Sequence, residues 1–346
     1  MLGEELIEKK WLVSEEELDD DQYKVKQLQM GNYIIEGSAG SGKTVLALHK
    51  AKEIQDLRLG TYLVIVYTNT LKTFIKDGVT SLGLSPDRVC NYHQLKKLGF
   101  DSADYIIVDE ILDFGNKAVQ NLINMAKKNF IFFGDDAQQL YSTKTANISI
   151  DKVINISNIN HNNHITLNKN YRLPIPIAEF AQQISLLEKN LTTCCVKNGG
   201  EKPLIIKHKT FTDELDTIYD IISKEGWGNC CILVHDNEEV KKVKDYYESK
   251  GLDIEYKYNN KNSQGESTID FYTDIPKVMT YHSSKGLQFQ HVFLPNCTIS
   301  TTQYDYRDAL YVAVTRASET LIITYSNSLS PYINRVKREY YDLQIK

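Results

Sequence analysis

The stretch IIEGSAGSGKTVLALHKA, residues 34–51, places glycines, hydroxyl residues and a lysine at a spacing suited to phosphate chemistry. Gly37, Gly42, Lys43 and Thr44 match the pattern G-x-x-x-x-G-K-[ST]. In such a loop backbone N–H groups surround phosphate, the lysine reaches the β- and γ-phosphate oxygens, and the threonine hydroxyl binds Mg²⁺. The sequence therefore predicts a nucleoside triphosphate site. The residues of its loop are Gly37, Ser38, Ala39, Gly40, Ser41, Gly42, Lys43 and Thr44.

A second oxygen ligand for the metal is expected from an acid at the end of a buried strand. The stretch YIIVDE, residues 105–110, supplies an acidic pair. Asp109 is the predicted Mg²⁺ ligand beside Thr44, and Glu110 is predicted to orient or deprotonate a water. A surface Asp-Glu pair is common, but a pair that closes a run of four apolar residues favours a catalytic function.

The first half of the chain alternates short apolar runs with helical patterns. Strands are expected at 32–36, 61–67, 104–109 and 129–135, with helices at 44–55 and 116–128. Strand–helix alternation is typical of a parallel sheet with helices on both faces. Residues 142–164 are rich in Ser, Thr and Asn, and we interpret them as a connector.

The pattern restarts after this connector, which predicts a second α/β half. Strands are expected at 203–209, 230–235, 277–282, 291–295 and 320–325. Helices are expected near 211–224, 237–250 and 305–317, and a polar loop at 259–268. The predicted fold class is therefore α/β, with two parallel sheets.

Composition restricts the classes of function. The 346 residues, 42% of them hydrophobic, suffice for the cores of two domains. The net charge of −5 argues against a uniformly basic surface but allows a local basic groove. No window approaches the roughly 20 apolar residues of a membrane span. Acidic residues near the start do not suit a signal peptide, so we expect a cytoplasmic protein without a membrane partner.

The cysteines and a histidine pair do not predict a metal site. The cysteines lack C-x-x-C spacing, and we interpret them as reduced cytosolic thiols. They are Cys90, Cys194, Cys195, Cys230, Cys231 and Cys297. His161 and His164 lie in an asparagine-rich stretch without a neighbouring cysteine or carboxylate in sequence. Such a pair is more typical of a solvated loop than of a ligand set.

Further stretches match one family in order and spacing. From about residue 20 to residue 320 the chain resembles a superfamily 1 helicase core of the UvrD/Rep type. The stretches that carry the resemblance, besides the two above, are DDDQYKV, YTNTL, NYHQL, GDDAQQLY, NKNYRL, MTYHSSKGLQFQHVFL and YVAVTRAS. The resemblance implies two RecA-like P-loop NTPase lobes, residues 1–160 and 161–346, with ATP and Mg²⁺ in the cleft between them.

The resemblance also implies functions for residues around the nucleotide. Gln22 would read adenine, and Tyr171 would pack against it, although a tyrosine at this position is equally typical of a core residue. Gln138 would couple the γ-phosphate to the polymer site. Arg172 and Arg316 would come from the second lobe to the γ-phosphate, where such arginines contribute about 10³–10⁵ in rate. Two further residues of the nucleotide site are Gly286 and Gln288.

The expected contacts with nucleic acid are short polar side chains near strand ends. By the resemblance they are Thr68, Asn69, His93, Thr280 and His282. Each of them alone is equally typical of an ordinary loop cap. The modest net charge and the lack of a tryptophan after GDDAQQLY predict weak binding of single strands.

The chain departs from the family at three points. The usual Gly-Leu-Glu-Phe reads GLQF here, and Gln288 in the glutamate position can still hydrogen-bond a ribose hydroxyl. The usual Asp-Glu-x-Gln reads DEIL here, with Leu112 in the glutamine position, which places the coupling of ATPase activity in doubt. In addition, Lys43 and Asp109 are only 66 positions apart, and Arg172 and Thr280 only 108. Processive members place accessory subdomains in both intervals, and this chain has little room for them.

The sequence predicts a nucleic-acid-dependent ATPase of the helicase or translocase type, acting on single-stranded or tailed duplex DNA. The alternative is an ATP-driven switch that senses nucleic acid or a protein partner, such as a nuclease in a defence or repair complex, without separating strands. The missing subdomains favour the switch, and the near-complete later motifs favour the motor. A small-molecule kinase is disfavoured, because it would not need the second α/β half.

Overall fold

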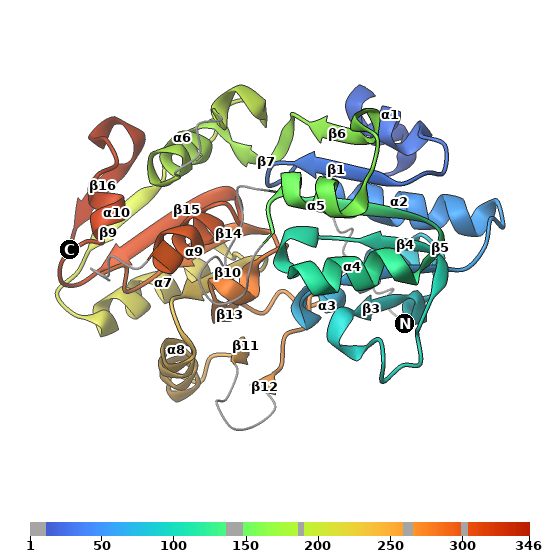
Figure 1. Ribbon diagram of the computed structural model, residues 1–346. Helices are drawn as coiled ribbons and strands as arrows, with labels where there is room; N and C mark the ends of the chain where they lie inside the picture. The colour runs from blue at the N-terminus through green and yellow to red at the C-terminus, as the bar shows by residue number, and fades with distance from the viewer. Residues whose placement is uncertain (1–11, 136–147, 186–189, 259–265, 299–303) are drawn as a thin grey trace. The chain divides into compact units, whose positions relative to one another are not determined.

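The computed structural model describes residues 12–135, 148–185, 190–258, 266–298 and 304–346 (Figure 1). These residues divide into two compact units. The first unit contains the described residues up to Asn168, and the second contains those from Lys169 onward. Each unit has its own sheet and its own hydrophobic core.

The first unit is built on a six-stranded sheet whose pairs are all parallel, in the order β3-β2-β4-β5-β1-β6. Its strands are β1 (Tyr33–Gly37), β2 (Tyr62–Val66), β3 (Val89–Asn91), β4 (Ala103–Val108), β5 (Ala126–Gly134) and β6 (His164–Leu167). Its helices are α1 (Asp20–Gln27), α2 (Lys43–Asp56), α3 (Asn69–Ser81), α4 (Asn116–Met125) and α5 (Ile150–Ser157). Because the strands are parallel, their carboxyl ends share one edge of the sheet.

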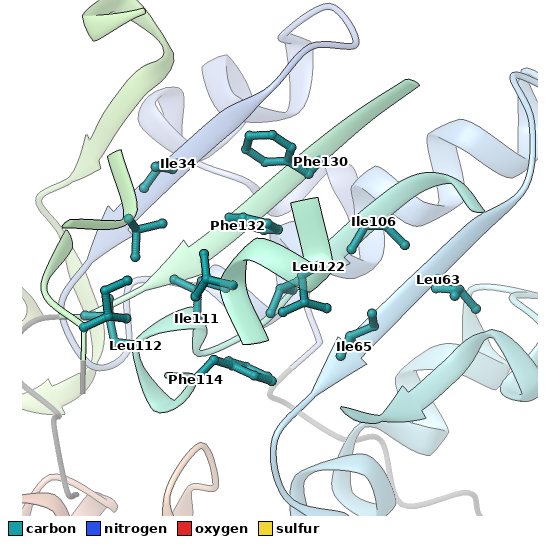
Figure 2. Packing of buried hydrophobic residues seen from close by; sticks show 14 of the residues in the cluster. Ile34, Leu63, Ile65, Ile106, Ile111, Leu112, Phe114, Leu122, Phe130 and Phe132 are labelled. Atoms are coloured by element: carbon teal, nitrogen blue, oxygen red, sulfur yellow. The ribbon is translucent and has the colours of Figure 1, made fainter. Parts of the chain in front are cut away.

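One part of the core of the first unit lies between this sheet and the helices α4 and α5. Figure 2 shows Phe130 and Phe132 of β5 beside Ile106 of β4, with Leu122 of α4 nearby. All four side chains are almost completely buried. Apolar residues on both faces of the central strands are what a parallel sheet covered by helices requires.

The second unit is built on an eight-stranded sheet in the order β12-β11-β13-β10-β14-β15-β9-β16. Its pairs are parallel except for β11 with β12, and β7 and β8 form a separate parallel pair. The strands are β7 (Asn170–Pro174), β8 (Cys195–Lys197), β9 (Leu204–Lys207), β10 (Cys230–Val234), β11 (Glu255–Tyr258), β12 (Glu266–Ser267), β13 (Lys277–Thr280), β14 (Phe289–Leu294), β15 (Ala317–Tyr325) and β16 (Asp342–Ile345). The helices are α6 (Ile175–Ile184), α7 (Phe211–Glu225), α8 (Asn237–Ser249), α9 (Tyr304–Val314) and α10 (Pro331–Asn334).

The predicted α/β class with two large parallel sheets is confirmed, as two sheets consistent with RecA-like lobes. The expected connector at 142–164 is wrong in its described part. Residues 150–157 form α5, because Ile150 and Val153 recur at helical spacing and are buried in the core. The expected helix at 116–128 ends at Met125, where β5 follows directly, and Glu266–Ser267 of the expected polar loop pair with β11.

The strand β6 changes two further expectations. It pairs in parallel with β1, so the first unit extends beyond residue 160 to Asn168. His164 opens this strand, and its Nε2 lies 3.1 Å from Oε2 of Glu36 on β1. His164 is therefore not a solvated loop residue, because strand pairing brings a carboxylate from far away in sequence to its side. In the parts of the chain that the structure describes, no helix has the length and apolar character needed to cross a membrane.

Candidate functional site

The loop between β1 and α2 has the backbone geometry that its glycines allow. Gly40 and Gly42 have φ angles of 77° and 88°, in the left-handed region that glycine enters without a steric penalty. A Cβ on Gly42 would lie 2.4 Å from Nε2 of Gln22, and one on Gly37 would lie 2.4 Å from Oγ of Ser41. Any larger residue at either position would therefore force the loop or its neighbour to move.

The Lys43 ammonium lies inside this loop. Its Nζ donates to the carbonyl oxygens of Gly37 at 2.7 Å and Ser38 at 3.1 Å, and lies 3.9 Å from Oδ2 of Asp135 at the end of β5. The hydroxyls of Ser38 and Ser41 are buried and have no hydrogen-bond partner in the described part of the chain. Buried hydroxyls without partners, beside an ammonium and the N-terminus of a 14-residue helix, fit a phosphate group.

Thr44 and Asp109 meet at the carboxyl edge of the first sheet. Oγ1 of Thr44 donates to Oδ2 of Asp109 at 2.6 Å, and Oδ1 of Asp109 accepts from the backbone N–H of Glu110 at 3.1 Å. Burial, reinforced by the nearby Glu110 charge, raises the pKa of Asp109 to about 6. A bound divalent cation would favour the ionised carboxylate. A hydroxyl and one carboxylate are the ligands that Mg²⁺ commonly takes from a protein beside substrate phosphates.

Glu110 follows Asp109 and is also buried, with 6% of its surface exposed. Its φ angle of 57° is unusual for a residue other than glycine and turns the chain from β4 into the short helix Ile111–Asp113. Left-handed conformations cost free energy and are concentrated at functional sites. In this turn the backbone N–H of Glu110 donates to the Asp109 carboxylate, so a hydrogen bond joins the two acidic residues.

Gln22, the predicted adenine reader, packs against the phosphate loop. It is 5% exposed, and its Nε2 donates to the Ser41 carbonyl at 3.1 Å. The other end of its amide, Oε1, accepts from the backbone N–H of Asp19 at 3.3 Å. Gln22 therefore joins α1 to the loop that carries Ser38, Ser41 and Lys43.

The predicted polymer contacts of the first unit follow the carboxyl ends of β2 and β3. Thr68 caps α3, with Oγ1 accepting from the Leu71 N–H at 3.1 Å. Asn69 and His93 are exposed. The His93 ring meets the edges of Tyr67 and Tyr92, each with a centroid separation of 5.5 Å. Short donors and aromatic rings thus share this part of the sheet edge.

The second unit brings together three of its predicted nucleotide residues. Arg172 on β7 donates from Nε to Oε1 of Gln288 at 3.2 Å and from Nη1 to the Thr315 carbonyl at 3.4 Å. Arg316 follows Thr315 and is completely buried. It donates from Nε to the Val312 carbonyl at 2.9 Å and from Nη1 to the Leu287 carbonyl at 3.0 Å.

The remaining predicted residues of the second unit lie on β7 and around the end of β13. Tyr171 is half-buried beside Arg172 in the chain, and Gly286 has a φ angle of 81°. Thr280 is the last residue of β13, and its hydroxyl donates to Ser283 Oγ at 3.1 Å. The Thr280 hydroxyl is therefore already hydrogen-bonded within the turn that follows the strand. His282 is partly exposed in the short helix His282–Ser284.

The comparisons with known proteins decide the family. A model of the viral superfamily 1 RNA helicase core domain matches residues 33–324, most of the chain. The chain belongs to this helicase family. Its superfamily 1 character is therefore confirmed, and membership implies NTP-dependent helicase or translocase activity on nucleic acid. Superfamily 1 helicases bind NTP with Mg²⁺.

Other comparisons are more distant. The C-terminal domain of a possible DNA helicase from Lactobacillus plantarum WCFS1 is 20% identical to this helicase core, with a TM-score of 0.40. The match covers 50% of this chain and 98% of that domain. No curated protein matches the chain.

The helicase core carries Leu112 at a position where the resemblance leads one to expect glutamine. Leu112 is 1% exposed and belongs to the hydrophobic core with Ile111 and Phe114 (Figure 2). A Cβ on Gly134 would lie 3.2 Å from Leu112 and 3.3 Å from Ile150 of α5. Position 112 is therefore an apolar contact in this chain. Gln138, the other predicted coupling residue, lies outside the described residues.

Motif analysis missed the residues that attach the N-terminal part of this helicase core to α2. His49 and Lys50 are buried polar residues on α2, and each hydrogen-bonds to the backbone of residues 13–28. The available signal was weak: a histidine and a lysine occur within VLALHKA, where the surrounding helix is apolar. Asp135, close to Lys43, was also missed.

Proposed function

We propose that this chain is an ATP-driven translocase or helicase acting on single-stranded nucleic acid. The observation that carries the proposal is the bond between Thr44 and Asp109 beside the loop of Lys43, within a superfamily 1 helicase core. The UvrD/Rep-like motifs favour DNA as the polymer, whereas the matching family is described as viral RNA helicases. Both polymers therefore belong in the test.

In this mechanism the first unit is the ATP-binding lobe. Thr44 and Asp109 would hold Mg²⁺, which neutralises charge on the phosphate oxygens when it is bound. Lys43 would exchange the carbonyls of Gly37 and Ser38 for phosphate oxygens, because a charged acceptor makes the stronger hydrogen bond. Glu110 would orient the attacking water and accept its proton.

The second unit is proposed as the lobe that supplies positive charge for phosphoryl transfer. Arg172 donates to the Thr315 carbonyl and Arg316 donates to the Thr315 hydroxyl. Because both arginines bond to Thr315, one rearrangement can move both. Gln288, which accepts a hydrogen bond from Arg172, would exchange it for a ribose hydroxyl. Binding of a polymer would favour this rearrangement and so stimulate turnover.

Polymer binding in the first unit is proposed along the edge that carries Asn69 and His93. Exposed short donors suit phosphate and sugar contacts, and the rings of Tyr67, Tyr92 and His93 form an aromatic cluster beside them. The second candidate function is the ATP-driven switch with a protein partner such as a nuclease. The short intervals 43–109 and 172–280, which leave little room for accessory subdomains, favour it.

The test is steady-state ATP hydrolysis with single-stranded DNA, single-stranded RNA, duplex DNA or no polymer. We expect one single-stranded polymer to stimulate turnover at least about tenfold and Lys43→Ala to abolish it. Lys52→Ala is the matched control, since Lys52 lies on the same helix but is 35% exposed and pairs with Asp56. Turnover that no polymer changes would overturn the motor. Stimulated turnover without displacement of a tailed strand would favour the switch.

A further inference from the structure

Lys50 is a second buried lysine on α2, about two helical turns after Lys43. Its side chain is completely buried, and Nζ donates to three oxygens. These are the carbonyls of Lys26 at 2.9 Å and Leu28 at 2.6 Å, and Oε2 of Glu53 at 2.9 Å. All three ammonium donors are therefore used. Burial lowers the pKa of Lys50, and the Glu53 carboxylate opposes that shift.

Lys50 bonds to the carboxyl end of α1. Lys26 is in the last turn of α1, and Leu28 is its C-cap residue. The last carbonyls of a helix lack partners within the helix and carry the negative end of its dipole. The Lys50 ammonium donates to two of these carbonyls and places a positive charge at the negative end of the dipole. Lys50 thus acts as the cap of a helix to which it does not belong.

The helix α1 has little else to hold it in place. It is eight residues long, too short to be stable alone, and its buried residues are Gln22 and Val25. Only one of these is apolar, so α1 has almost no hydrophobic face for docking. Polar bonds must therefore fix its position on the first unit, where it lies beside α2 (Figure 1).

Two further bonds attach the same segment. Nε2 of His49 lies 3.0 Å from the Val13 carbonyl, and Nε2 of Gln22 donates to the Ser41 carbonyl of the phosphate loop. Gln22 also packs directly on Gly42. Residues 13–28 therefore form a clasp, anchored by Lys50 at the end of α1 and by Gln22 at its start.

We propose that Lys50 is a positioning residue for the nucleobase end of the nucleotide site. By capping α1 it holds Gln22 against the phosphate loop, and so sets the affinity and base selectivity for a purine nucleoside triphosphate. Lys50 does not touch the phosphates, whose binding depends on Lys43 and the loop. This inference rests on the ATP site of the proposed function, with Gln22 in the base-reading role that the resemblance implies.

The test compares Lys50→Met with wild type in equilibrium binding of fluorescent ATP and GTP analogues with Mg²⁺. Methionine retains most of the length of the lysine side chain but cannot donate to the Lys26 and Leu28 carbonyls. We expect the Kd for the ATP analogue to rise about tenfold, with a smaller rise for GTP and thus reduced selectivity. Lys52→Met on the same helix should change neither Kd.

Two readouts separate positioning of the base from damage to the loop. The first is competition by inorganic tripolyphosphate, which has no base; its Ki should be unchanged in Lys50→Met. The second is the double variant with Gln22→Ala, whose Kd should equal that of the worse single variant, because both act through one contact. Independent, additive effects would overturn the proposal, and so would a tripolyphosphate Ki that rises in parallel with the ATP Kd.

Further variants protect the test against failure to fold. Lys50→Arg keeps a donor to the α1 carbonyls and should restore base selectivity at least in part. If Lys50→Met does not fold, unchanged base selectivity in Gln22→Ala overturns the proposal. The binding measurements contain no polymer, so they test the role of Lys50 independently of the motor function. If wild-type protein binds ATP but no polymer changes its turnover, only the proposed motor function is contradicted. If the ATP Kd is unchanged in Lys50→Met, only the proposed role of Lys50 is contradicted.

Discussion

The two units satisfy the polar groups of their predicted nucleotide residues in different ways. In the first unit, the buried hydroxyls of Ser38 and Ser41 beside Lys43 have no hydrogen-bond partners in the described ranges. In the second unit, Arg316 donates to the carbonyls of Val312 and Leu287 and to the Thr315 hydroxyl. An anion that enters the loop gains the serine donors directly and displaces only the carbonyl bonds of Lys43, whereas an anion at Arg316 has to displace every one of the bonds named above.

This difference predicts a division of labour. Donors that are buried without partners favour binding as soon as a phosphate arrives, since their desolvation has already occurred. Arginines already bonded to neutral oxygens contribute after a rearrangement, so they act on rate more than on affinity. We therefore expect nucleotide affinity to depend on the first unit and turnover to depend on the arginines of the second.

The largest effect is expected from Arg316→Ala. The substitution removes a predicted catalytic charge and leaves the buried Leu287 carbonyl without the donor that Arg316 supplies, while the Val312 carbonyl still accepts from the Thr315 hydroxyl. Turnover should fall about 10³-fold or more, and the free energy of unfolding should fall by about 2–4 kcal/mol. The measurements are steady-state ATP hydrolysis and urea denaturation, with nucleotide binding measured in the same buffer.

Arg172→Ala is the matched variant, because Arg172 is only partly buried and bonds to Gln288 and Thr315. Turnover should again fall about 10³-fold, but the free energy of unfolding should change by less than about 1 kcal/mol. The Kd for nucleotide should stay within about twofold of wild type in both variants. A Kd that rises as steeply as turnover falls would contradict the division between the units.

An intermediate effect is expected from Leu112→Gln, which introduces the glutamine that the resemblance to UvrD/Rep helicases leads one to expect at this position. The amide would enter a core formed with Ile111, Phe114 and Ile150, and burying it should cost about 1–3 kcal/mol of unfolding free energy. Leu112→Met is the control and should cost less than about 1.5 kcal/mol. Polymer-stimulated turnover should not increase. Full stability together with stronger stimulation would show that position 112 serves coupling after all.

The parts of the site that could be predicted from sequence are those encoded in contiguous patterns. The loop of Lys43 and the pair Asp109 and Glu110 each follow one strand, and parallel strands bring their carboxyl ends to one edge. That alone places Thr44 near Asp109, as the 2.6 Å bond shows. The long apolar strands of both sheets were also predictable, because each is a contiguous run of apolar residues.

The remaining features depend on contacts between distant segments. Ile150 and Val153 lie in a stretch rich in Ser and Asn, so composition hid a helix that the core requires. Lys50 reads as an ordinary lysine until α1 is placed against it. The buried Arg316 guanidinium donates to the carbonyls of Leu287 and Val312, and no sequence motif describes these two acceptors.

Two buried carboxylates of the second unit, Glu214 and Glu239, supply the smallest expected effect. Glu214 on α7 accepts from Asn296 N–H at 2.8 Å and from Thr324 Oγ1 at 2.6 Å, while its Oε1 has no hydrogen-bond partner among the described residues. Glu239 on α8 accepts from the Asn296 amide and from the His235 N–H. Burial raises the pKa of both carboxyls, although these hydrogen bonds oppose it.

A carboxyl whose pKa is raised by folding stabilises the fold when it is protonated, and this contribution is lost as the pH rises through the folded-state pKa. Wild-type protein should therefore lose more stability between pH 5 and pH 8 than Glu214→Gln, which cannot ionise. The difference should be smaller than the effect of Leu112→Gln. The neighbouring residues Asp236 and His235 are present in both proteins, so the comparison of urea midpoints isolates the effect of the substitution at Glu214. Parallel pH profiles would show that Glu214 carries no such proton linkage.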